Sequence, residues 1–104
     1  MQLLAREERV HALDAEYAGE GNPVLKLKFF DPCGSWTWYA VDGQPVGNDY
    51  EFYGFVKGFE SEWGYFSLNE LEEFVGKLGV GIERDLYFIS KPFSELTDLE
   101  RGRY

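Results

Sequence analysis

Apolar and polar residues alternate along several short stretches of the chain. The clearest is residues 24–30, where leucine or phenylalanine stands at every second position with lysines between. This period of two predicts a strand with one solvent-exposed face. Residues 36–41, 50–57 and 62–66 are rich in aromatic and β-branched residues and predict three more strands. The apolar run at residues 86–89 predicts a last strand.

A change of period after Ser67 predicts a helix over residues 68–78. Ser67 and Glu70 have the spacing of a capping box, in which the serine side chain accepts a hydrogen bond from the glutamate amide. Gly79 suits the left-handed residue that follows a helix. Residues 1–14 show a weaker pattern of the same kind and predict a short N-terminal helix. In the helix 68–78, the apolar residues at helical spacing are Leu68, Leu71, Phe74, Val75 and Leu78.

Glycine, proline, asparagine and aspartate mark the connections between these elements. Residues 15–23 are predicted to form a loop, residues 31–34 a turn, and residues 42–49 a loop of the hairpin type. Residues 100–104 are predicted to be a frayed tail. The chain has neither an internal repeat nor a linker-like segment, so one domain is expected.

The expected fold class is α+β. Its antiparallel sheet of about four to five strands forms a meander within residues 24–90. The well-capped helix 68–78 packs on this sheet, and the short N-terminal helix adds to it. The single domain spans residues 1–104.

The predicted sheet is apolar on both faces. The strand at residues 36–41 places Trp36 and Trp38 on one face and Tyr39 and Val41 on the other. One helix of about three turns cannot cover both faces. Either the N-terminal helix and the C-terminal segment cover the second face, or that face stays partly open and marks an interaction site.

The chain is strongly acidic. Its 104 residues include 19 Asp and Glu against 10 Lys and Arg, for a formal net charge of −9. This charge repels phosphate backbones and anionic lipid surfaces, so direct binding of nucleic acid or membranes is not expected. A single cysteine excludes an internal disulfide, and the N-terminal residues lack the apolar run of a signal peptide. The expected location is therefore the cytoplasm.

Side chains suited to catalysis are few. His11 is the single histidine and Cys33 the single cysteine, which leaves no pair for nucleophilic catalysis and no zinc motif. The chain is therefore expected to be no enzyme and to hold no cofactor or metal ion. The triplet of Glu83, Arg84 and Asp85 is expected to be a structural cluster of ion pairs, with the acid that contacts Arg84 left open.

Acidic residues are concentrated in one part of the chain. Residues 42–73 contain eight acids and one base, Lys57. Such a run indicates either a solvated surface or a face that presents carboxylates to a basic groove. Nearby aromatic residues are candidate anchors, because buried aromatic side chains dominate the energetics of interfaces. The candidate partner-binding residues are Glu51, Glu60, Glu62, Glu70, Glu72, Glu73, Trp36, Trp38, Tyr53 and Trp63.

Five short motifs follow one another along the chain. They are KFFDP at 28–32, WTWY at 36–39, FYGFV at 52–56, GYFSLNEL at 64–71 and GIERDL at 81–86. This ordered series resembles the bacterial family "domain of unknown function 2958", from the first helix to Leu96. Trp63 stands where that family favours a smaller aliphatic residue. The resemblance implies no activity and no catalytic residue, but it implies a source in plasmids, phages and other mobile elements, near DNA-transfer or anti-defence genes.

The sequence therefore favours a small acidic module that binds a protein. It would occupy a basic or nucleic-acid-binding surface of a host defence or DNA-processing protein, as an inhibitor or a mimic of DNA. One alternative is a metal-dependent hydrolase or nuclease-like enzyme that uses Glu62, Glu83 and Asp85. Another is an assembly subunit that dimerises through an open sheet face or an edge strand. The oligomeric state stays open between a monomer and a homodimer.

Overall fold

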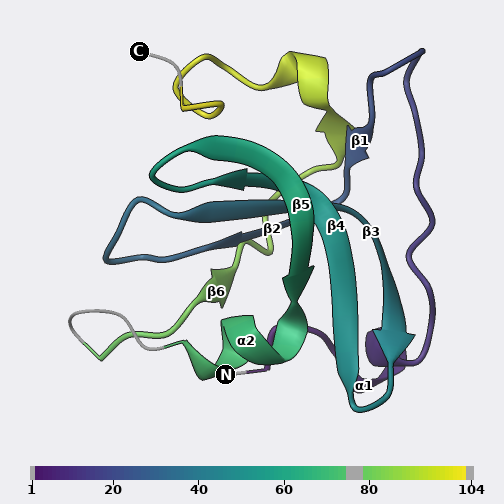
Figure 1. The fold of residues 1–104 in the computed structure, drawn as a ribbon, viewed down its shortest axis with the longest axis vertical. Coiled ribbons are helices and arrows are strands. Elements are labelled where there is room, and N and C mark those ends of the chain that lie inside the picture. Colours follow the sequence, from purple (N-terminus) through teal and green to yellow (C-terminus); the bar gives the residue numbers. More distant parts are fainter. Residues whose placement is uncertain (1, 75–78, 103–104) are drawn as a thin grey trace.

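The computed structural model describes residues 2–74 and 79–102 (Figure 1). Within them, a five-stranded antiparallel sheet has the order β5-β4-β3-β2-β6, and a two-stranded sheet pairs β1 with β7. Strands β2 to β5 form a meander, which confirms the predicted α+β class. The elements are α1 (Arg6–Arg9), β1 (Val24–Leu25), β2 (Leu27–Phe30), β3 (Thr37–Val46), β4 (Asp49–Lys57), β5 (Ser61–Ser67), α2 (Leu68–Glu73), β6 (Glu83–Arg84), β7 (Lys91–Pro92) and a 3₁₀ turn (Phe93–Glu95).

The hairpin between β3 and β4 is longer than the sequence predicts. Instead of a loop over residues 42–49, β3 continues to Val46, which pairs with Asp49, so that only two residues form the turn. Gly43 resembles a loop residue in the sequence, but it has a packing role. A Cβ atom there would lie 2.5 Å from the ring of Tyr50. The glycine therefore lets an aromatic ring lie against the strand.

The predicted strand at residues 86–89 is wrong. The strand that pairs with β2 is β6, and the chain turns away after it, with the Asp85 side chain accepting a hydrogen bond from the Tyr87 amide. Leu86, Tyr87 and Ile89 are exposed, while Phe88 packs on the sheet beside Tyr39. An apolar run of four residues does not distinguish a paired strand from a segment that crosses over a sheet.

Both helices are shorter than predicted. Only Arg6–Arg9 of residues 1–14 are helical, and Leu3 and Leu4 are buried ahead of this turn. Helix α2 ends at Glu73 because Phe74 is extended, with its amide donating to the carbonyl groups of Glu70 and Leu71. The rest of that predicted helix, residues 75–78, lies outside the described residues. None of the helices described has the length and apolar character needed to cross a bilayer.

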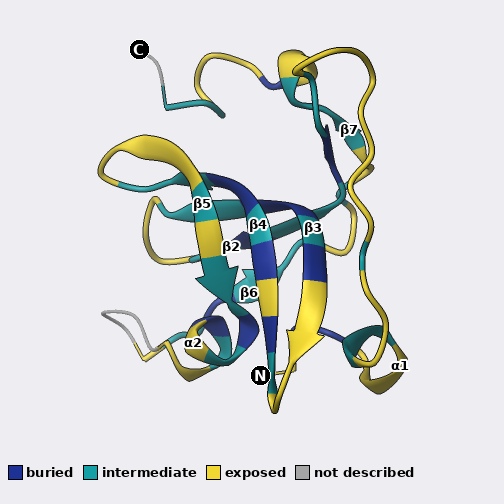
Figure 2. Ribbon diagram, turned by 45° about the vertical axis from the view of Figure 1, so that its right-hand side comes forward, coloured by how far each residue is buried: buried dark blue, intermediate teal, exposed yellow. Residues whose placement is uncertain are grey.

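Two apolar clusters lie on opposite faces of the main sheet. On one face, Leu3, Leu4, Ile82 and the α2 residues Leu68 and Leu71 cover the sheet. On the other face, Leu96 from the C-terminal segment covers the sheet, together with partly buried Phe88 and Phe93. Figure 2 shows the middle of β3 and β4 as buried and much of β5 as exposed. The second face is thus covered by the C-terminal segment and open near β5. The main sheet contributes Phe29, Ala40, Tyr50 and Phe52 to the first cluster and Tyr39, Val41 and Phe55 to the second, which Leu25 of β1 joins.

Asp49 holds the start of α2 against the hairpin. The hydroxyl of Ser67 accepts a hydrogen bond from the amide of Glu70, as the sequence predicts, and itself donates to Asp49. The Asp49 carboxylate also accepts from the amides of Asn69 and Tyr50. Burial raises the pKa of Asp49, but these hydrogen bonds outweigh it and lower the pKa below its usual value.

Asp49→Ala is expected to lower the free energy of unfolding by about 1–2 kcal/mol, because the first turn of α2 loses an acceptor. Asp49→Asn keeps one acceptor oxygen and should lose less. Urea unfolding of the three proteins at neutral pH measures both differences. Equal stability of Asp49→Ala and the unchanged protein would contradict the capping role.

Candidate functional site

The four aromatic side chains predicted as anchors lie on two different faces. Trp38 pairs with Val56 and packs against the cluster beneath α2, and Trp36 stacks on it with ring centroids 5.8 Å apart. Tyr53 and Trp63 point to the opposite face, because Tyr53 and Phe55, the residue opposite Trp63, are an odd number of positions from Val56. The structure therefore brings Tyr53 and Trp63 together, with centroids 6.1 Å apart, and separates them from the tryptophan pair.

A row of aromatic rings crosses the second face along β4 and β5. We call it the aromatic row: Tyr65, Tyr53, Trp63, Phe55 and Phe93. Neighbouring centroids are 5.0 Å apart for Tyr53 and Tyr65, 5.3 Å for Phe55 and Trp63, and 5.0 Å for Trp63 and Phe93. Tyr65 is 72% exposed and Trp63 37%, whereas Phe55 is buried. The row thus runs from the core to solvent, and its exposed end lies on β5.

The C-terminal segment packs against Phe93, at the end of the aromatic row farthest from Tyr65. The Arg101 guanidinium lies 4.8 Å from the centre of the Phe93 ring and donates hydrogen bonds to the carbonyl groups of Phe93 and Ser94. Residues 100–102 of the predicted frayed tail therefore make defined contacts, while residues 103 and 104 lie outside the described residues. The exposed rings of Tyr65 and Trp63 remain as the accessible part of the row.

Five of the six predicted acidic contact residues are exposed around β5. Glu60 precedes the strand, Glu62 lies on it, and Glu51 is opposite its last residue, Ser67. Glu70 and Glu73 follow on α2. Glu51 shares the sheet face of the exposed aromatic rings, whereas Glu62 and helix α2 lie on the opposite face, so the acids border β5 on both faces of the sheet.

Glu72 is engaged inside the protein. Its carboxylate pairs with Arg9 at 2.5 Å and accepts a hydrogen bond from the amide of Leu3 at 2.8 Å. The Glu72 side chain is only 17% exposed. It therefore fastens the N-terminal segment to α2, and the acids available to a partner are the other five.

Two of the three residues at 83–85, Arg84 and Asp85, form ion pairs with distant parts of the chain, and Glu83 pairs through its backbone with Phe30. Arg84 pairs with Glu8 at 2.8 Å and also donates to the carbonyl of Leu3. The hydrogen bond from Arg84 lowers the pKa of Glu8, with burial acting in the opposite direction. Asp85 lies 3.6 Å from the ammonium group of Lys28 on β2. The acid that contacts Arg84 is thus the distant Glu8, and these pairs fasten α1 and β6 to the sheet.

The three carboxylates proposed for a metal-dependent hydrolase, Glu62, Glu83 and Asp85, do not lie together. Glu62 lies on β5, whereas Glu83 and Asp85 lie on or beside β6, at the opposite edge of the sheet with three strands between. Within residues 2–74 and 79–102, no three potential protein ligands are grouped around one point. These three residues therefore do not form one metal centre.

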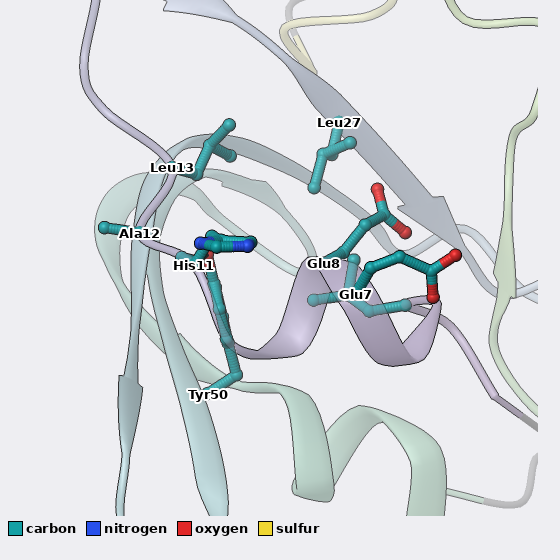
Figure 3. Close-up of a pocket in the computed structure, with 8 residues that line it drawn as sticks. Glu7, Glu8, His11, Ala12, Leu13, Leu27 and Tyr50 are labelled. Carbon is teal, nitrogen blue, oxygen red and sulfur yellow. Dashed lines mark hydrogen bonds between the residues drawn. The ribbon is translucent and has the colours of Figure 1, made fainter.

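A small hollow lies between α1 and the sheet. It has a volume of about 310 Å³, and Figure 3 shows His11 and Tyr50 on one side of it and Glu7 and Glu8 on the other. The hydroxyl of Tyr50 donates to the carbonyl of His11 at 2.7 Å, and burial raises the pKa of Tyr50. Among the described residues that line the hollow, His11, Glu7, Glu8 and Tyr50 are polar, and none is a serine, threonine or cysteine. Its other lining residues are Leu4, Ala12, Leu13 and Leu27.

Comparison with known proteins decides the family. A family model described as "Protein of unknown function (DUF2958)" matches residues 1–101. The chain belongs to this family. No curated protein matches the DUF2958 chain, and no solved structure does.

In this DUF2958 chain, Tyr65 is an exposed ring beside Tyr53 that the sequence did not place among the candidate contact residues. The signal was present, because Tyr65 stands two positions after Trp63 in a predicted strand and must share its face. Side chains alternate between the two faces along each strand, so the register of β3, β4 and β5 places Trp36 and Trp38 on one face and Tyr53 and Trp63 on the other. The arrangement on β5 combines exposed rings with a border of carboxylates, which suits the binding of a basic, partly apolar protein surface.

Proposed function

We propose that this chain is a small acidic protein-binding module whose contact surface is centred on β5. The observation that carries this proposal is the exposed part of the aromatic row, Trp63 and Tyr65, bordered by Glu51, Glu60 and Glu62 on the same hairpin. Aromatic rings provide contact area at little entropic cost. Carboxylates around them favour a basic partner and speed its association.

The proposed partner is a protein whose basic surface otherwise binds nucleic acid. A net charge of −9 on 104 residues is repelled by nucleic acid itself and attracted to the proteins that bind it. We further propose that bacterial mobile elements encode the chain and that its target is a host defence or DNA-processing protein. Binding would then block the target by occupying its nucleic-acid surface.

Affinity capture from a bacterial lysate at low and moderate salt tests this function. A basic nucleic-acid-binding protein is expected to be retained at low salt and released as salt rises, because screening weakens attraction between exposed charges. A variant that removes four charges around β5 should bind this protein at least about tenfold more weakly, with a flatter salt dependence. The four substitutions are Glu60→Gln, Glu62→Gln, Glu70→Gln and Glu73→Gln.

A matched control removes four exposed charges elsewhere, so that both variants have the same net charge. Its affinity should stay within about threefold of the unchanged protein, since distant exposed charges are largely screened. Equal loss in the two variants would show that only the overall charge matters and would refute a binding surface at β5. The control substitutions are Glu7→Gln, Glu20→Gln, Glu95→Gln and Asp98→Asn.

A further inference from the structure

Strand β5 forms one edge of the main sheet, and Gly102 of the C-terminal segment lies beside its first residue, Ser61. The strand has seven residues, and β4 is the only strand paired with it in the part of the chain that the structure describes. The opposite edge, β6, has only two residues. An edge strand presents a row of backbone N–H and C=O groups that another strand can pair with. β5 therefore offers a longer template for strand pairing than β6.

The two sides of β5 differ in chemistry. Trp63 and Tyr65 project on the face of the aromatic row, and Glu62 projects on the face of α2. Between them, Gly64 has no other atom within 4 Å of the place where a Cβ atom would stand. A strand added beside β5 would meet rings on one face and a carboxylate on the other, at alternating positions.

We propose that β5 accepts an extended basic segment of the partner protein as an added sixth strand, an inference that rests on the function proposed above. The segment would place lysine or arginine opposite Glu62 on one face. On the other face, an aliphatic side chain or the stem of a basic one would lie against Trp63 and Tyr65. Main-chain hydrogen bonds give such strand addition its affinity, and the alternating side chains give it its specificity.

Charge argues for a basic segment rather than a second copy of this chain. Each copy carries a net charge of −9, with Glu60 and Glu62 at the edge itself. Parallel in-register pairing of β5 with β5 would set Glu62 against Glu62, and any pairing of two copies brings two strongly negative chains together, which is destabilising. A basic segment removes this repulsion and pairs with the same groups.

A nine-residue synthetic peptide of alternating lysine and valine tests the proposal. Residue-resolved amide hydrogen exchange should slow at β5 when the peptide binds and stay unchanged at β6. A second peptide has the same sequence but is N-methylated at three consecutive central residues. It keeps its charges, and the methylated residues cannot donate backbone hydrogen bonds along either edge of the extended peptide. It should bind at least about tenfold more weakly, because it loses main-chain hydrogen bonds. A peptide of alternating glutamate and valine should not bind.

Two tyrosine variants provide the control on the protein side. Tyr65→Ser should weaken binding of the lysine–valine peptide about fivefold or more, because the peptide loses the aromatic ring against which its valine side chains or lysine stems would pack. Tyr87→Ser should leave it unchanged, because Tyr87, although 94% exposed, follows β6 at the opposite edge of the sheet from β5.

The outcomes separate strand addition from the broader function. Equal binding of the methylated and unmethylated peptides would refute strand addition and leave the acidic binding surface standing. No binding of the lysine–valine peptide, or protection at a site other than β5, would also refute strand addition. Failure of the broader function would instead appear in the lysate experiment, as equal losses in the two charge variants.

Discussion

Gly54→Ala is expected to lower the free energy of unfolding by roughly 3 kcal/mol or more. A Cβ atom at Gly54 would stand 1.8 Å from the carbonyl oxygen of Tyr39 and 3.0 Å from the Cα atom of Ala40. Both are backbone atoms of β3, the central strand, which is held by ladders on both sides. Neither can move aside as a flexible side chain would, so the sheet itself must distort.

Gly64→Ala is the matched control for this experiment. Gly64 lies directly opposite Gly54 in the β4–β5 ladder, but a Cβ atom there would have no neighbour within 4 Å. Its stability should stay within about 0.5 kcal/mol of the unchanged protein. Urea unfolding midpoints compare the two substitutions. Equal losses would mean that the close approach of β3 is not what makes glycine necessary at position 54.

The protein is expected to lose roughly 2–3 kcal/mol of stability between about pH 10 and pH 12 because of Tyr39 alone. Burial, with smaller effects from the carboxylates of Glu100 and Asp85, raises the pKa of Tyr39 to about 12. The folded protein therefore keeps this proton over a range in which the unfolded chain, with an ordinary tyrosine pKa near 10, releases it. The stabilisation is complete below pH 10 and disappears as pH rises through the folded pKa.

Tyr39→Phe isolates this contribution from the other groups that titrate in alkali. The variant keeps the ring contacts with Phe55 and Phe88 and has no proton to lose. Its unfolding free energy, measured by urea titration at several pH values, should decline less steeply than that of the unchanged protein between pH 10 and 12. Parallel declines would show that the Tyr39 hydroxyl is ionised as easily in the folded protein as in the unfolded chain.

The meander was predictable because its strands carry strong local patterns. Period-two alternation and aromatic content mark most of β2, β3, β4 and β5 in the sequence. The length of the β3–β4 hairpin was not predictable, because Gly43 and Pro45 are typical of loops. In the structure, β2 pairs with β3 only as far as Ala40. Pro45 lies beyond this point, so no β2 residue is left without a hydrogen-bond donor by the N–H group that proline lacks.

The candidate site was predictable in its composition and less so in its geometry. Its acids and rings stand close together in the sequence, but which of them share a face depends on the register between strands. Trp36 and Trp63 look equivalent in the sequence and lie on opposite faces. Glu72 looks like its neighbours Glu70 and Glu73, yet it is held by Arg9, from a segment 63 positions away, which no local pattern reveals.

The contacts that fasten the N-terminal segment have a consequence for how the chain acquires its structure. Leu3 donates to Glu72 across 69 positions, and Arg84 reaches Glu8 across 76, whereas each hairpin of the meander closes a short loop. Closing a long loop costs more chain entropy than closing a short one. On the ribosome, where the N-terminus emerges first, Leu3 and Leu4 must wait for α2 and β6 before they can be covered. Leu3 and Leu4 are thus synthesised before α2 and β6 but buried only once these elements have formed.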